Sequence, residues 1–273
     1  MRQRTMGGAM KTLWPFGLRA DYDRDVARLV RPIDGIETDR VRELELALLP
    51  APVRRYLQVS GVVGQPHVHT VAARMHGRIR GGPGAPWMPI VAEQHNVLVP
   101  AARLFYFDGT MAGMPVQGYH RYVDASASML VRLAALIPVA RASGDEMTRS
   151  ETVTLFNDMC VLAPATLLSP AIAWEPVDAR RARARFTNGG HTIGADLSFG
   201  PGGELVDFQS DDRSRAAPDG RFERVRWSTP LGACRRFGPV RLAATGEGRW
   251  HERAGGYAYI ELTIDDVRYN VRP

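Results

Sequence analysis

The sequence has little cysteine and almost no lysine. Only Cys160 and Cys234 are cysteines among the 273 residues, too few for a disulfide framework or a cysteine-based zinc site. Lys11 is the one lysine, so arginine supplies nearly all of the 35 basic side chains. No metal site is predicted either: His67 and His69 share one strand face, but no third ligand has a suitable spacing.

Long hydrophobic runs are also absent. No stretch of about eighteen apolar residues is present that could span a membrane as a helix. The N-terminus is basic, like the start of a signal peptide, but the apolar segment 13–18 is short and interrupted by Pro15. We therefore expect a cytoplasmic protein in which residues 1–20 form a flexible arm.

Motifs for phosphate binding and for nucleophilic catalysis are missing as well. No glycine-rich loop follows a strand and opens a helix, and no Gly-x-Ser-x-Gly sequence occurs. The net charge of +6 would suit nucleic acid, but the arginines alternate with apolar residues and form no patch with interleaved aromatics. We therefore predict no cofactor and no nucleic-acid partner.

The segment 148–162, TRSETVTLFNDMCVL, predicts one long helix. Thr148 and Glu151 have the spacing of a capping box, and Pro164 ends the helix because it disfavours helical geometry at the preceding residue. Apolar side chains occupy nearly the whole circumference, which is typical of a helix buried on several sides.

Glu151 and Asp158 lie two turns apart on one face of this helix, among leucines. A carboxylate in such surroundings must be paired, hydrogen-bonded or neutralised. Two interpretations are open: the acids bind arginines or strand backbone and hold the helix in place, or they line a cavity and meet a ligand. Candidate arginine partners are Arg103, Arg121 and Arg132.

The rest of the chain predicts an α+β domain over residues 21–273. Residues 21–64 are expected to be helical, in segments 21–30, 39–48 and 52–59 with a linker over 32–38. From residue 65 the hydrophobic period is two, and turn signals every 8–12 residues favour an antiparallel meander of about ten strands. Segment 128–136 is predicted to be a short helix that ends before Pro138.

Other candidate binding residues are Glu93, Trp227 and His191. Glu93 begins the run Glu-Gln-His-Asn, whose alternation places two polar side chains on each face of a strand, so that one pair should face the interior. His191 follows an Asn-Gly-Gly turn and is expected to cap it. The loop 211–213, Asp-Asp-Arg, is expected to be exposed.

Several segments resemble a bacterial family of uncharacterised proteins, a domain of unknown function. They include LPAPVRRYLQVSGVVG, SETVTLFNDMCVLAPATLL, FTNGGHTI, GELVDFQSDDR and FGPVRLAATGEGRW. The last segment and the C-terminal DDVRYNV also distantly resemble the lipoprotein-carrier (LolA/LolB-like) superfamily. That resemblance implies an antiparallel sheet curled into a half-open barrel, with a helical plug in its concave face and a hydrophobic cavity within. We therefore expect a strongly curved antiparallel sheet, a half-open barrel, around the plug helix 148–162, with the N-terminal helices outside.

The leading functional hypothesis is binding of a hydrophobic or amphipathic small molecule, such as a lipid or acyl compound. Glu151, Asp158 and Glu93 would supply polar contacts in a cavity between sheet and helix. The alternative is general acid–base catalysis in the same cavity, with Glu151 or Asp158 as base and His95 or His191 nearby. A structural or partner-binding protein without a cavity is a third hypothesis. Peripheral contact with a membrane and the oligomeric state are left open.

Overall fold

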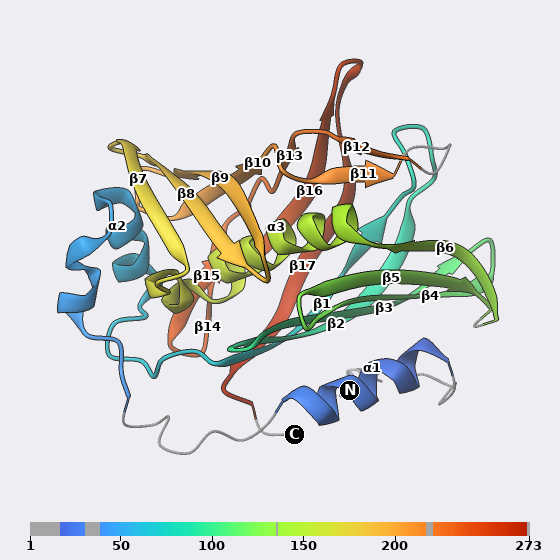
Figure 1. Ribbon diagram of the computed structural model, residues 1–273, viewed down its shortest axis with the longest axis horizontal. Coiled ribbons are helices and arrows are strands. Elements are labelled where there is room, and N and C mark those ends of the chain that lie inside the picture. Colours follow the sequence, from blue (N-terminus) through green and yellow to red (C-terminus); the bar gives the residue numbers. More distant parts are fainter. Residues whose placement is uncertain (1–16, 31–38, 135, 217–220, 272–273) are drawn as a thin grey trace, which may run out of the picture.

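The computed structural model describes residues 17–30, 39–134, 136–216 and 221–271. In this part of the chain, thirteen strands form one antiparallel sheet that curls around the helix α3 (Asp145–Leu162) (Figure 1). Along the sheet the order is β6 (Ile137–Ser143), β5 (Ser126–Leu133), β4 (Met114–Val123), β3 (Ala101–Met111), β2 (Met88–Leu98), β1 (Thr70–Ile79), β17 (Gly255–Tyr269), β16 (Thr245–Glu252), β13 (Trp227–Ser228), β10 (Leu205–Ser210), β9 (His191–Phe199), β8 (Arg181–Asn188) and β7 (Ile172–Asp178). The predicted curved antiparallel sheet around a central helix is confirmed.

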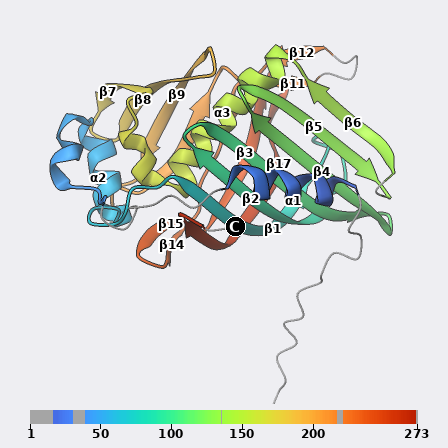
Figure 2. The same cartoon turned by 60° about the horizontal axis from the view of Figure 1, so that its bottom comes forward.

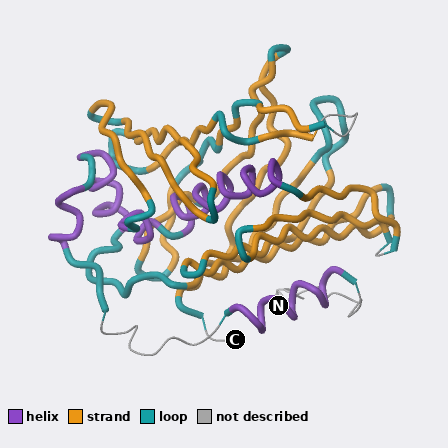
Figure 3. Tube along the Cα trace, viewed as in Figure 1, coloured by secondary structure: helices purple, strands orange, loops and turns teal. Residues whose placement is uncertain are grey.

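Two short hairpins accompany the sheet. One pairs β11 (Ser214–Ala216) with β12 (Phe222–Arg224), and the other pairs β14 (Cys234–Phe237) with β15 (Val240–Ala243). In Figure 3 strands flank α3 on both sides, so the helix lies inside the curl.

Bulges and a close strand contact bend the sheet. The pairing register shifts between Arg74 and Met75 in β1 and between Gly248 and Arg249 in β16, and such bulges increase local twist and bending. A Cβ atom at Gly77 would collide with the carbonyl oxygen of Glu261, so glycine is required where β1 and β17 approach each other.

Burial of α3 agrees with its predicted all-round apolar surface. From Met147 to Leu162 every residue except Arg149 is buried. Phe156 has no exposed surface and stacks on Phe186 at a ring-centroid distance of 5.1 Å, with Phe208 at 5.7 Å. One face of α3 therefore packs on β8 and β10, and the opposite face is left for the strands β1 to β5.

The predicted capping box at the start of this helix is wrong. The helix begins earlier, at Asp145 after Gly144, and Thr148 lies in its first turn. The Thr148 hydroxyl donates to the Gly144 carbonyl and accepts from the backbone N–H of Ala127, so it ties the helix to β5. The carboxylate of Glu151 points to arginine instead of to the helix N-terminus.

The N-terminal helices lie on the outer face of the sheet (α1, Leu18–Leu29) and at one end of the curl, where the Tyr56 hydroxyl donates to the Cys160 carbonyl of α3. Helix α1 packs on β3 and β4 across the face of the sheet that points away from α3 (Figure 2). A short 3₁₀ helix, η1 (Glu43–Leu48), precedes α2 (Ala51–Ser60), and another, η2 (Pro164–Leu168), follows α3. None of the described helices is long and apolar enough to cross a membrane.

The expected arm over residues 1–20 and linker over 32–38 fall largely outside the described residues. Where the arm can be compared, its boundary is wrong: α1 already begins at Leu18, and that side chain is buried. Leu18 and Tyr22 pack with Leu104, Tyr106 and Tyr119 in a separate apolar cluster under α1. This packing explains why the helix starts before the predicted Asp21.

The predicted short helix over 128–136 is also wrong. Segment 126–133 forms β5, and 137–143 forms the edge strand β6. The backbone of β5 pairs with β4 from Val116↔Leu133 to Val123↔Ser126, which satisfies the hydrogen-bonding groups that β4 would otherwise expose. Strand pairing thus overrides the local helical pattern.

Candidate functional site

A cavity of about 140 Å³ lies between α3 and the concave face of the sheet. Its wall is mainly apolar, with residues from β1, β3, α3, β16 and β17. The apolar lining includes Met75, Ile79, Phe105, Phe107, Val161, Leu162, Trp227, Leu231, Ile260, Leu262 and Ile264. The polar lining includes Gln94, Arg103, His120, Glu151, Thr154, Asn157, Asp158, Arg213, Thr229, Glu247 and Tyr259.

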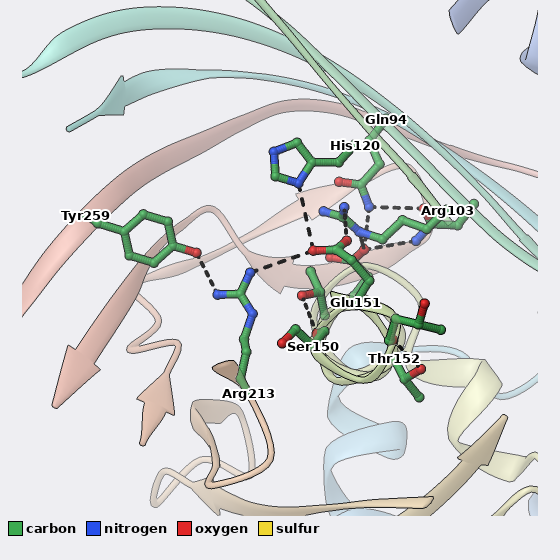
Figure 4. Close-up of polar contacts among 12 residues, drawn as sticks. Gln94, Arg103, His120, Ser150, Glu151, Thr152, Arg213 and Tyr259 are labelled. Atoms are coloured by element: carbon green, nitrogen blue, oxygen red, sulfur yellow. Dashed lines mark hydrogen bonds and ion pairs between the residues drawn. The ribbon is translucent and has the colours of Figure 1, made fainter. Parts of the chain in front are cut away.

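Arg103 on β3 connects the two helix carboxylates. Its Nη1 lies 3.0 Å from Glu151 Oε2, and its Nε lies 2.6 Å from Asp158 Oδ2 (Figure 4). The three side chains are almost wholly buried, with exposed fractions of 7%, 2% and 10%. One guanidinium can reach both acids because they are two helical turns apart on one face. The first interpretation is therefore confirmed, because the acids bind an arginine; they also line a cavity, and their contact with a ligand stays a prediction.

Two amides on β2 complete the surroundings of Asp158. Gln94 Nε2 donates to Asp158 Oδ2 at 2.7 Å, and Asn96 Nδ2 donates to the same oxygen at 3.2 Å. Gln94 and Asn96 are two residues apart and therefore share the inward face of the strand. The expected inward-facing polar pair is confirmed, and it consists of the two amides.

The two acids respond differently to the same arginine. Burial alone would raise the pKa of Glu151, but Arg103, His120 and Arg213 together outweigh burial and lower this pKa to about 2. Burial raises the pKa of Asp158, and the Arg103 guanidinium, which also serves Glu151, offsets this only in part. Glu151 therefore stays ionised, and Asp158 is the first of the pair to take up a proton as pH falls.

A second arginine approaches Glu151 from the other side of the cavity. Arg213 Nη2 lies 3.8 Å from Glu151 Oε1, and Nη1 donates to the hydroxyl of Tyr259 at 2.8 Å (Figure 4). The Arg213 guanidinium carbon lies 4.5 Å from the ring centroid of Trp227 and 5.2 Å from that of Trp250. This cation is held mainly by aromatic faces, which attract positive charge through their quadrupoles.

His120 on β4 lies at the same edge of the cavity. Its Nδ1 is 3.8 Å from Glu151 Oε1, and its ring meets Phe105 edge-on at 5.9 Å. Glu151 is therefore the centre of a group of three cationic or potentially cationic side chains, contributed by β3, β4 and the segment before β11.

Three of the five predicted binding residues, Glu151, Asp158 and Trp227, line the cavity. Glu93 does not, because it points to the outer face of β2 and pairs with Arg19 of α1 at 3.0 Å. His191 does not either: it lies near the start of α3, with Nε2 3.4 Å from Asp145 Oδ1. The expected place of Glu93 and His191 in the cavity is therefore wrong.

His95, the other proposed proton carrier, also lies outside the cavity. It points outward from β2, and its Nδ1 is 2.7 Å from the hydroxyl of Tyr22 on α1. Strand alternation explains both outcomes on β2: Glu93 and His95 share the outer face, opposite to the two inward amides.

Arg213 and His120 are the cavity residues that sequence reasoning missed. Arg213 was expected in an exposed loop because it follows two aspartates, yet only 9% of its surface is exposed. Asp212 turns away from it and pairs with Arg149 at 2.6 Å. A usable signal was the alternation in β4, which places His120 on the same face as Gly118 and Val116.

Among the described residues, no cluster of three or more His, Cys, Asp or Glu side chains is arranged to hold a metal ion. The carboxylates of the cavity face arginines and amides, which are donors and leave little room for a cation.

The fold and the site define an α+β half-barrel, plugged by one helix and enclosing an apolar cavity with a buried charge network. The chain belongs to a family of unknown function, DUF6544, whose model matches residues 39–262. The expected membership in an uncharacterised family is thereby confirmed. No curated protein matches the chain in sequence.

Solved structures that are similar to this chain include the following two. One is a putative outer membrane lipoprotein-sorting protein domain from Vibrio parahaemolyticus, with 10% identity and a TM-score of 0.41, covering 73% of this chain and 85% of that one. The other is a DUF1329 family protein from Desulfovibrio piger, with 13% identity and a TM-score of 0.44, covering 85% of this chain and 94% of that one.

Proposed function

We propose that this protein binds a hydrophobic or amphipathic small molecule in the cavity between α3 and the sheet. The observation that carries the proposal is an apolar space of about 140 Å³ next to α3, whose lining also contains polar groups that include Glu151, Arg103 and Arg213. A cavity of roughly 150 Å³ lined by aliphatic and aromatic side chains is large enough to hold benzene. The space therefore suits a short alkyl chain or a single ring.

Binding is favoured over acid–base catalysis by the state of the two carboxylates. A general base needs a pKa near the working pH and a free lone pair. Glu151 is a very weak base, because its pKa is lowered to about 2 by Arg103 and its neighbours despite burial. Asp158 Oδ2 accepts from Arg103, Gln94 and Asn96. Glu151 and this oxygen of Asp158 thus fix the helix and the charges around the cavity.

The cavity also has a route toward the surface. A groove of about 520 Å³ on the other side of the β16–β17 region shares Leu231, Thr245, Gly246, Glu247 and Leu262 with the cavity wall. Leu231 forms an isolated bridge to Gly246, and backbone hydrogen bonds join residues 230–232 to Val206, Thr245 and Glu247. We propose that a ligand enters through this shared part of the wall.

The test is calorimetric titration of the full chain with hexanol, a neutral amphiphile short enough for the cavity. Burial of a six-carbon chain at about 0.8 kcal/mol per methylene corresponds to a dissociation constant on the order of 1 mM. Val161→Phe, which fills the cavity from α3, is expected to abolish the binding. Val91→Phe is the matched control, since Val91 is exposed on the outer face of β2.

Native mass spectrometry of gently purified protein complements the titration. Binding in the cavity is supported if an amphiphile co-purifies with the unaltered protein and with Val91→Phe but not with Val161→Phe. Hexanol affinity unchanged by Val161→Phe refutes the cavity as the site. The cytoplasmic location and contact with a membrane surface stay predictions that fractionation of cells would examine.

A further inference from the structure

Four polar atoms around the cavity are buried without a hydrogen-bond partner. They are Asn157 Oδ1, Arg213 Nε, Trp227 Nε1 and Thr229 Oγ1, and the side chains of all four residues line the same cavity. Buried polar groups in folded proteins are almost always hydrogen-bonded, because leaving one unpaired forfeits its interaction with water. Several unpaired groups around one cavity point to a ligand that pairs them.

Three of these groups, in Arg213, Trp227 and Thr229, can donate a hydrogen bond, and all three residues line the cavity. Trp227 and Thr229 are two residues apart at the end of β13, and the Thr229 backbone N–H is fixed by the Phe208 carbonyl at 2.8 Å. The Arg213 guanidinium carbon lies 4.5 Å from the Trp227 ring. A guanidinium N–H, an indole N–H and a hydroxyl form a set that suits an acceptor with several oxygens.

Of the two arginines that line the cavity, Arg213 is the one less engaged by the three lining carboxylates, Glu151, Asp158 and Glu247. Arg213 has no carboxylate closer than Glu151 Oε1 at 3.8 Å, among the ion pairs of the described residues. Glu151 is bound more tightly by Arg103, at 3.0 Å, and the second carboxylate, Asp158, belongs to Arg103 as well. The closest polar partner of Arg213 is the neutral hydroxyl of Tyr259. A buried cation in this situation favours an anion within reach.

We propose that the ligand is an alkyl carboxylate whose head group is bound by Arg213, Trp227 and Thr229. This inference rests on the proposed function, because it specifies the ligand of the same cavity. The alkyl chain lies along Met75, Phe105, Phe107 and Ile264, the apolar wall formed by β1, β3 and β17. Arg213, whose nearest carboxylate oxygen lies 3.8 Å away, and a space of about 140 Å³ suit a singly charged, short-chain acid.

The test is calorimetric titration with three ligands that share one tail: hexanoate, hexanol and hexylammonium. Hydrogen bonds to charged groups correspond to about a tenfold to hundredfold gain in affinity, so hexanoate should bind that much more tightly than hexanol. Hexylammonium should bind more weakly than either. Hexyl phosphate is included, and tighter binding of the phosphate than of hexanoate would overturn the assignment of a carboxylate.

Thr229→Val separates a role in binding from a role in folding. The variant removes a buried hydroxyl that has no partner, so thermal stability should be unchanged or higher, while hexanoate affinity falls about tenfold. Affinity for hexanol should not change. Thr70→Val is the matched control, because the Thr70 hydroxyl on β1 is also buried and unpaired but does not line the cavity.

Trp227→Phe is the second variant, since it removes the indole N–H and keeps an aromatic ring under Arg213. If the unaltered protein binds hexanoate and hexanol with equal affinity, the assignment of an anionic head group is overturned and the proposed binding function is retained. Failure of all the ligands would overturn the proposed function itself. Hexanoate affinity unchanged in both Thr229→Val and Trp227→Phe would refute the assignment of these residues.

Discussion

Replacement of Arg103 by methionine is expected to destabilise the protein strongly. The substitution removes the cation that lies 3.0 Å from Glu151 and 2.6 Å from Asp158, and it leaves two carboxylates almost fully buried. Removal of one partner from a buried ion pair costs about 3–5 kcal/mol. Since folded domains are stable by only about 5–15 kcal/mol, Arg103→Met should consume a large part of the total.

Urea unfolding at pH 7 measures this loss, and two further variants control it. The triple variant Arg103→Met, Glu151→Gln, Asp158→Asn removes the charges together and should recover much of the stability. Arg78→Met breaks an exposed two-hydrogen-bond pair with Glu261 and should have only a small effect, because solvent screens exposed pairs.

The pH dependence of the Arg103→Met effect has a definite sign. Without the arginine, burial raises the pKa of both acids in the folded state above their unfolded values. The folded variant then binds protons more readily than the unfolded variant, so its stability rises as pH falls. The loss of unfolding free energy relative to the unaltered protein should therefore be largest at pH 7 and smaller at pH 5. A deficit no larger than that of Arg78→Met, or one that does not change with pH, would refute the view of a desolvated charge network.

Three further predictions concern the same architecture. The pKa of Glu151 is lowered from its ordinary value of 4.5 to about 2. Its contribution to folding stability, about 3 kcal/mol, is therefore present above pH 4.5 and is lost as pH falls toward 2. Acid unfolding of Glu151→Gln should depend less on pH in this range than acid unfolding of the unaltered protein. Gly118→Ala should lower stability by about 1–3 kcal/mol and weaken hexanol binding, because the added Cβ meets the Phe107 ring on the cavity wall. The control Gly81→Ala places its Cβ in open space and should change neither the thermal unfolding temperature nor the hexanol affinity. Thr148→Val should lower the stability of the protein by about 1–3 kcal/mol and speed hydrogen exchange at the Ala127 amide, which loses its acceptor. An unchanged exchange rate would show that the hydrogen bond from β5 to α3 is unimportant.

Local patterns were sufficient for most of the elements. The alternating segments 114–123 and 191–199 form β4 and β9, within the region that the sequence predicts as an antiparallel meander, because side-chain alternation and the flanking turns are local properties. The apolar circumference of 148–162 predicted a buried helix, which is a property of the segment alone. The run 93–96 predicted one inward polar pair for the same reason.

Pairing across the fold decided what local patterns could not. Segment 126–133 is a strand because β4 offers it a partner. Strand β7 was not predicted; it contains Pro176, which is tolerated because β7 lies at the edge of the sheet.

The sequence by itself determined that Glu151 and Asp158 share a buried helix face and need a partner. It named Arg103, Arg121 and Arg132 as equals, and only the tertiary structure selected Arg103, because β3 turns that side chain inward while Arg121 faces Asp25 on the outer side. The unpaired donors around Arg213 were likewise invisible to the sequence. Whether a polar atom finds a hydrogen-bond partner depends on which distant segments surround it, and the curling of the sheet decides which segments these are.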